Sequence, residues 1–147
     1  MRSFSANTHI AAGTQRVWSV LADVARWPEW LPTVTAVTPL DAPALSIGAR
    51  FTVQQPRLRP AIWSVVELDL PHRFAWESRS PGVRTFADHV VAASSVETTI
   101  VTLGITFHGP LRLVAGLLAG RLTQEYLTSE AASLKQRVES DDAQGMV

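Results

Sequence analysis

The chain has 147 residues, no cysteine and a formal net charge of zero, with 13 basic and 13 acidic residues. Hydrophobic residues make up 46% of it and charged residues 18%, so one domain can bury a sizeable core and wholesale disorder is not expected. The lack of cysteine excludes a disulfide framework, a thiolate metal site and a cysteine nucleophile. The balanced charge argues against nucleic acid or an anionic membrane as a partner, because either would need a basic face.

The first ten residues, MRSFSANTHI, lack the basic and apolar regions of a signal peptide. The most apolar stretch, residues 111–122, contains Arg112 and is shorter than the ~20 residues that a membrane span needs. We therefore expect no integral membrane span and a cytoplasmic location.

The N-terminal part predicts a strand, a helix and a one-turn helix. Residues 3–10 read as the strand, and a helical pattern opens at Gly13. The apolar residues of this pattern lie at i, i+3, i+4 and i+7: Val17, Val20, Leu21 and Val24. Asp23 can cap a second, short helix, Pro28 fits its first position, and Pro32 ends it.

The middle of the chain predicts an antiparallel sheet. Its short β runs are separated by turn residues and cover 34–40, 50–54, 62–69, 73–79, 83–92 and 97–107. Hairpin-length loops join the last five runs, which is typical of a meander.

The C-terminal part predicts one long helix. Residues 111–139 contain no proline and would form a helix about 43 Å long. We expect residues 1–139 to form one domain and residues 140–147 a flexible tail. Small residues cluster early in the helix, at Ala115, Gly116, Ala119 and Gly120. Each glycine costs about 1 kcal/mol relative to alanine inside a helix, so a compensating role is expected. The small residues either leave room for a ligand or reflect close backbone packing or a kink without function.

This order of elements resembles the START-like or SRPBCC superfamily, and most closely its polyketide cyclase/dehydrase-like branch. Three stretches carry the resemblance: VWSVLADVARWPEWLP at 17–32, WSVVELDLPHRFAWESR at 63–79 and TFHGPL at 106–111. It covers nearly the whole chain. It implies an α+β helix-grip fold, in which a curved antiparallel sheet wraps around the long C-terminal helix, with two short helices after the first strand. It also implies an apolar cavity between sheet and helix.

The resemblance gives the tryptophans of residues 17–32 a structural role. A curved sheet crossed by one helix cannot seal both of its ends, so the two short helices would plug one of them. Trp27, Trp30 and Leu31 would then lie at the rim of the cavity. Alternatively, these tryptophans only attach the short helices to the sheet.

Alternation along the strands predicts which side chains face the cavity. We expect Trp63, Val65 and Trp76 to face it, together with Phe86, which a hairpin at residues 80–82 would bring opposite Trp76. The predicted ligand-binding residues are Trp30, Leu31, Phe51, Trp63, Val65, Trp76, Phe86, Leu118 and Leu122. Alternatively, the aromatic residues fill the core and leave no cavity.

The candidate catalytic residues are His89, Arg84 and Asp88. Alternation puts Arg84 and Asp88 on the face of Phe86 and His89 on the opposite face, although a β-bulge would reverse this. His89 otherwise reads as a surface or hydrogen-bonded sheet histidine, and Arg84 as a solvent-exposed side chain. Asp88 and Glu67 are the carboxylates that could approach the cavity, where desolvation would raise the pKa; a solvated rim position is expected for Glu67.

We expect no metal site and no cofactor. The four histidines have no paired helical spacing, and the pair Asp88-His89 is too short a motif for a metal site. The sequence also has neither a Gly-x-Ser-x-Gly turn nor a glycine-rich phosphate loop.

Three functions remain open, because this scaffold hosts many activities. The first is binding of a small hydrophobic ligand (a lipid, a polyketide or an aromatic compound) in the internal cavity, as a carrier or sensor, by a monomer or homodimer. The second is a polyketide cyclase, aromatase or dehydratase that uses the same cavity. The third is a protein-interaction module, which would need an exposed apolar patch.

Overall fold

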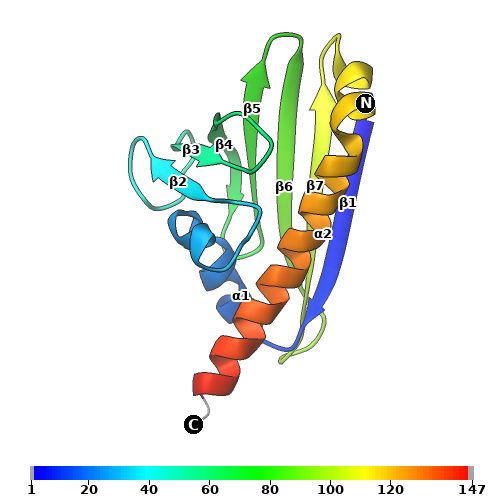
Figure 1. Cartoon of the computed structure of the whole chain (residues 1–147). Helices are drawn as coiled ribbons and strands as arrows, with labels where there is room; N and C mark the ends of the chain where they lie inside the picture. Colours follow the sequence, from blue (N-terminus) through cyan, green and yellow to red (C-terminus); the bar gives the residue numbers. More distant parts are fainter. Residues whose placement is uncertain (1, 146–147) are drawn as a thin grey trace.

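The computed structural model describes residues 2–145, which form one seven-stranded sheet, two short helices and one long helix (Figure 1). The strands are β1 (Arg2–Ile10), β2 (Ala36–Pro39), β3 (Arg50–Gln54), β4 (Ala61–Asp69), β5 (Arg73–Ser80), β6 (Val83–Ala93) and β7 (Thr99–His108). The helices are α1 (Thr14–Leu21), the 3-10 helix η1 (Val24–Glu29) and α2 (Arg112–Gly145).

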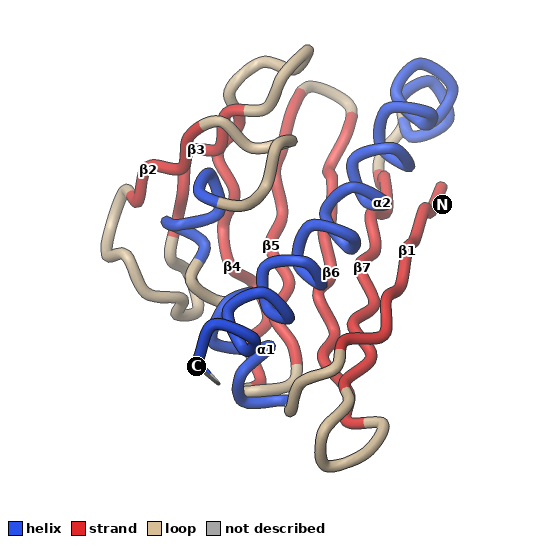
Figure 2. Tube along the Cα trace, turned by 60° about the horizontal axis from the view of Figure 1, so that its bottom comes forward, coloured by secondary structure: helices blue, strands red, loops and turns tan. Residues whose placement is uncertain are grey.

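The sheet is antiparallel throughout, in the order β1-β7-β6-β5-β4-β3-β2. It curls, and α2 crosses its concave face diagonally, from the end of β7 to α1 (Figure 2). Helices α1 and η1 follow β1 and lie at the C-terminal end of α2 (Figure 1). This is the α+β helix-grip arrangement that the sequence predicts.

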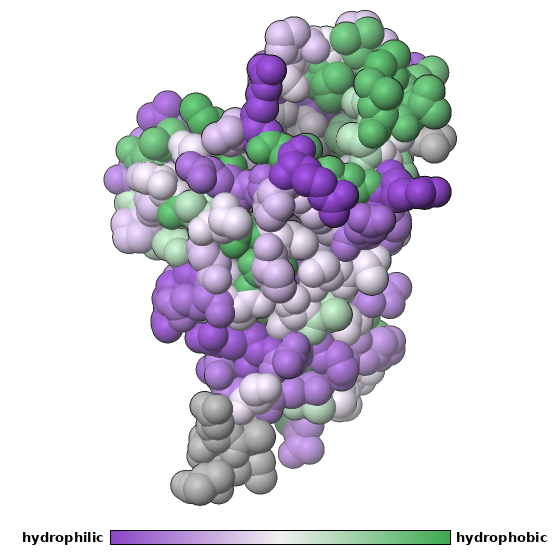
Figure 3. All heavy atoms as spheres, viewed as in Figure 1, coloured by the Kyte–Doolittle hydropathy of each residue, from purple (hydrophilic) through white to green (hydrophobic). Residues whose placement is uncertain are grey.

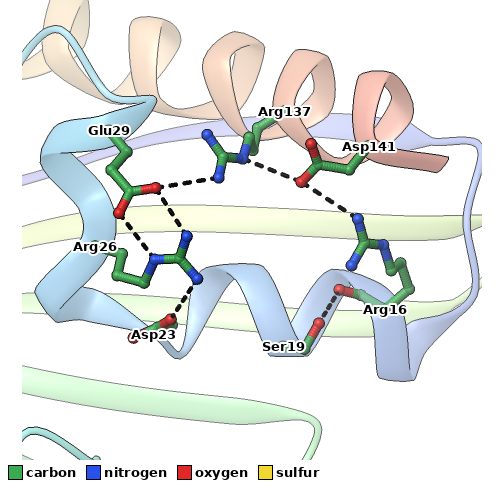
Figure 4. Close-up of polar contacts among 7 residues, drawn as sticks. All are labelled: Arg16, Ser19, Asp23, Arg26, Glu29, Arg137 and Asp141. Carbon is green, nitrogen blue, oxygen red and sulfur yellow. Dashed lines mark hydrogen bonds and ion pairs between the residues drawn. The ribbon is translucent and has the colours of Figure 1, made fainter. Parts of the chain in front are cut away.

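Helix α2 ends at Gly145, so residues 140–145, which we expected in a tail, continue the helix. Residues 146–147 lie outside the described part of the chain. Charged side chains hold this end: Asp141 accepts a hydrogen bond from Arg137, one turn earlier, and pairs with Arg16 of α1 at 3.3 Å (Figure 4). Arg137 also reaches Glu29 of η1, at 3.3 Å. Exposed pairs contribute little singly, but this network joins three helices.

The buried core fills the space between the sheet and the part of α2 from Leu127 onward. From α1 it receives Val17 and Leu21 of the predicted apolar spacing, together with Trp18, whereas Val20 is half-buried. From α2 it receives Leu127, Ala131, Leu134 and Val138, again one helical stripe. The part of α2 that precedes Leu127 adds no apolar side chain to this core.

The predicted register of the β5–β6 hairpin is wrong by one residue. Ser80 pairs with Val83, so the turn contains only Pro81 and Gly82, and Trp76 lies opposite Ala87 instead of Phe86. Gly82 has φ of +77°, the conformation that glycine supplies after proline in a tight turn. A shift of one residue moves every side chain of β6 to the other face.

A β-bulge between Val65 and Glu67 interrupts the alternation in β4. Val65 stays opposite Trp76, but Glu67 is displaced opposite Ala75. Its carboxylate forms an ion pair with Arg73, which also binds Asp88, with 2.8 Å between Nε and Oδ1. Neither carboxylate is therefore free to act in a cavity.

The small residues of α2 serve both purposes that the sequence left open. Ala115 and Ala119 face open space between helix and sheet. Gly120 packs against β1, because a Cβ atom there would lie 2.8 Å from the ring of Phe4.

Candidate functional site

A cavity of about 370 Å³ lies between α2, η1 and strands β3 to β7. Its size falls in the range of small-molecule sites. Three tryptophans line it: Trp27 from η1, Trp63 from β4 and Trp76 from β5. Most of its other wall residues are small or apolar, among them Val34, Val53, Ala61, Val83, Ala87, Ile105, Phe107 and Leu127.

The cavity has a buried floor and an exposed mouth. Trp27 and His89 belong to the floor, with only 2% and 3% of their surface exposed. The mouth consists of Leu58, Arg59 and Ser80, which are exposed residues of the lining. A ligand would therefore pass one apolar and two polar side chains at the mouth before it reaches the aromatic floor.

Trp27 is the centre of the aromatic floor. Its ring lies 5.4 Å from that of Trp76, 5.8 Å from that of His89 and 6.2 Å from that of Trp30. Its indole N–H donates a hydrogen bond of 2.9 Å to the carbonyl of Leu21, so its one polar atom is satisfied. The tryptophan in the short helix thus both attaches η1 to the sheet and forms the cavity wall.

His89 lies beside this floor as a neutral group. Its ring stacks on Phe74, with centroids 4.0 Å apart and planes 8° apart. Burial lowers the pKa of His89 to about 4, so the imidazole is uncharged at neutral pH. Its Nδ1 lies 3.2 Å from the carbonyl oxygen of Phe74, and a carbonyl can only accept. Nδ1 therefore carries the proton, and Nε2 is the nitrogen that can accept a hydrogen bond.

Glu130 is the acidic group of the cavity that the sequence analysis missed. No other described residue forms a hydrogen bond or an ion pair with its carboxyl group, which lines the cavity on the α2 side. Burial raises the pKa of Glu130 to about 8, so this carboxyl is largely protonated at neutral pH. A protonated carboxyl can donate one hydrogen bond and accept another.

The spacing of the cavity-lining residues along α2 is the sequence signal that could have identified Glu130. Cavity-lining residues of α2 recur every three or four positions: Ala115, Ala119, Thr123, Tyr126 and Glu130. The Tyr126 hydroxyl donates to the carbonyl of Pro56, which ties α2 to the loop between β3 and β4. Following the small residues down the helix would have predicted this stripe.

The structure places the nine predicted ligand-binding residues differently. Trp63 and Trp76 line the cavity. Leu31, Phe51 and Val65 are buried in the core, and Trp30 and Leu122 are half-buried outside the lining. The prediction that Phe86 and Leu118 face the cavity is wrong: the β6 register turns Phe86 to the outer face, and the phase of α2 leaves Leu118 81% exposed.

Of the three candidate catalytic residues, His89 alone has its side chain among the floor groups. Arg84 is exposed and lies 3.7 Å from Glu77. Asp88 borders the cavity, but its carboxylate binds Arg73. The sequence placed His89 on the opposite face of its strand from Arg84 and Asp88, but it assigned the wrong face of β6 to the cavity.

Within the described part of the chain, no three histidine or acidic side chains gather into a possible metal site. Among the described helices, none is long and apolar enough to cross a membrane.

A profile of the family described as polyketide cyclase/dehydrase and lipid transport matches residues 1–139. No curated protein matches the chain by sequence. Among similar solved structures, XoxI from Bacillus cereus is 16% identical over 97% of this chain and 99% of its own, with a TM-score of 0.77.

Two other structures are similar over nearly the whole chain. A START superfamily protein from Mycobacterium smegmatis is 16% identical, with a TM-score of 0.73 and coverage of 95% of this chain and 99% of its own. Norcoclaurine synthase from Thalictrum flavum, in complex with dopamine and hydroxybenzaldehyde, is 14% identical, with a TM-score of 0.71 and coverage of 95% and 87%. At such identities the likeness shows the fold alone.

Proposed function

Because the chain belongs to the polyketide cyclase/dehydrase and lipid transport family, we propose that it binds one small, mainly hydrophobic molecule in its cavity, as a carrier or sensor. The observation that carries this proposal is the cavity itself, about 370 Å³ with three tryptophans in its wall. An apolar wall with a few polar groups is the usual composition of a small-molecule site.

The polar groups of the cavity narrow the ligand class. Glu130 offers a hydrogen-bond donor at neutral pH, and His89 offers an acceptor at Nε2. A lipid, polyketide or aromatic compound with a hydroxyl group could pair with either residue, and one with a carbonyl group could accept the proton of Glu130. A pure hydrocarbon would leave the carboxyl without a partner. The aromatic compounds bound by norcoclaurine synthase support the aromatic class.

Filling the cavity tests the proposal. We expect Ala119→Trp to weaken binding of anilinonaphthalene sulfonate, a fluorescent apolar dye, at least about tenfold, because the new ring would occupy the space of the ligand. Ala132→Trp, at an exposed position of the same helix, is the matched control. Equal dye affinity in both variants and the wild type would show that the dye binds elsewhere.

Glu130 and His89 also favour a second candidate function, an enzyme of the cyclase or dehydratase type. A carboxyl group with a pKa of about 8 can donate a proton near neutral pH, and a neutral imidazole can accept one. For an enzyme, Glu130→Gln would lower turnover by orders of magnitude while dye binding persists. For a carrier, the same variant would alter affinity alone.

A further inference from the structure

The first turns of α2 expose an unusual number of large apolar side chains. This leucine face consists of Leu111, Leu113, Val114, Leu117 and Leu118. Leu117 and Leu118 are 83% and 81% exposed. Figure 3 shows a hydrophobic area over this part of α2, at the top of the molecule. Single exposed leucines are ordinary, but a contiguous group indicates an interaction surface.

The leucine face ends abruptly along the helix. From Arg121 onward the exposed positions of α2 are polar except for Ala132, with Glu125 and Thr128 following Arg121 at helical spacing. The apolar surface is therefore confined to one end of the molecule, about two turns of helix in length.

This end is also where the cavity opens. Ala115 and Ala119, on the same turns as the leucine face, line the cavity. Across the mouth, Leu58 of the β3–β4 loop is 45% exposed. The N–H of Leu111 donates a hydrogen bond of 2.9 Å to the carbonyl of Gly82, which fixes the start of α2 against the β5–β6 turn. The apolar residues therefore form part of the rim around the mouth.

The same end is basic, although the whole chain is neutral. The β3–β4 loop, the β5–β6 hairpin end and the start of α2 carry six arginines: Arg57, Arg59, Arg79, Arg84, Arg112 and Arg121. The same three segments carry two carboxylates, Glu77 and Glu125, so the local charge is 6 − 2 = +4. Arg59 and Arg121 have no ion-pair partner among the described side chains.

We propose that this end of the molecule docks onto an anionic lipid bilayer, with the leucine face among the headgroups and the arginines on lipid phosphates. Apolar side chains flanked by arginine are the combination that binds anionic membrane surfaces. Two copies would bring like charges together, which disfavours a homodimer through this face. Docked in this way, the mouth would face the layer in which hydrophobic molecules dissolve.

Vesicle flotation tests the proposal on the full chain. We expect binding to vesicles of phosphatidylcholine with phosphatidylglycerol, and binding at least about tenfold weaker to phosphatidylcholine alone. The double variant Leu117→Glu/Leu118→Glu should lose at least about tenfold in affinity for the anionic vesicles. Val96→Glu is the matched control, because Val96 is also exposed and apolar but lies in the β6–β7 loop at the other end.

A second pair of substitutions tests the charge. Arg59→Gln/Arg121→Gln should lower affinity for anionic vesicles about fivefold or more, with no change for neutral ones. Wild-type binding that equals that of Leu117→Glu/Leu118→Glu would overturn the proposal. So would a wild-type dimer, or a stable protein complex, that this double variant dissociates while no form of the chain binds vesicles.

Docking of the leucine face onto vesicles and binding of a ligand in the cavity can be tested independently of each other. The leucine face does not line the cavity, so Leu117→Glu/Leu118→Glu should bind soluble dye as the wild type does. Loss of vesicle binding with intact dye binding is the result expected for a docking surface.

Discussion

Replacing Trp27 with alanine is expected to lower the free energy of unfolding by about 3–5 kcal/mol, the cost of removing a large buried aromatic side chain. Trp27 touches the rings of Phe74, Trp76 and His89, and is the link between η1 and the sheet. Its loss would open the floor of the cavity and leave the carbonyl of Leu21 without its donor. Urea denaturation followed by circular dichroism measures the change.

Trp30→Ala is the matched control, since it also removes a tryptophan side chain, three residues further along the chain. Trp30 is only half-buried, and its ring contacts that of Trp27 alone among the described aromatic side chains. We expect a loss of about 1 kcal/mol. Equal losses for the two variants would mean that Trp27 is not the centre of the floor.

The second large effect is a loss of stability when Glu130 ionises. The pKa of Glu130 rises from its ordinary 4.5 to about 8 on folding, so the unfolded chain releases this proton at lower pH than the folded protein does. Stability therefore falls as the pH rises from 4.5 to 8, and the full penalty applies above pH 8. The shift corresponds to about 2–4 kcal/mol, allowing for the partial exposure of Glu130.

His89 has the opposite dependence. Its pKa falls from 6.5 to about 4 on folding, so its contribution is complete above pH 6.5 and is lost as the pH falls toward 4. The two effects oppose each other between pH 4.5 and 6.5, and Glu130 dominates between pH 6.5 and 8.

Urea denaturation of the wild type and Glu130→Gln across this pH range tests the assignment. The variant should lose the decline in stability above pH 6.5 and keep the decline in acid that His89 causes. A decline above pH 6.5 that is the same in both proteins would show that Glu130 is not the responsible group.

The sequence predicted the order of elements because each boundary has a strong local cause. The segment of η1 ends at Glu29, shortly before Pro32. The tight turn at Pro81 and Gly82 separates β5 from β6, and α2 begins just after Pro110. What local patterns could not provide was the count of residues in a turn. One residue fewer in the β5–β6 turn, and one bulge beside Val66, decided which side chains face the cavity.

Alternation along the strands predicted two residues that line the cavity, Trp63 and Trp76. The site was missed on α2, where Ala115, Ala119 and Glu130 lie along one side of the helix. A glutamate at the edge of an apolar stripe ordinarily points to solvent. Only the unfilled space between α2 and the sheet makes Glu130 a cavity residue, and that space depends on the curvature of the whole sheet.

Nuclear Overhauser effects between bound anilinonaphthalene sulfonate and the protein test most directly whether the cavity is the ligand site. We predict contacts from the dye to the methyl groups of Ala115 and Ala119 and to the indole of Trp63. Contacts confined to Leu117 and Leu118, with unchanged signals from the cavity residues, would contradict the account.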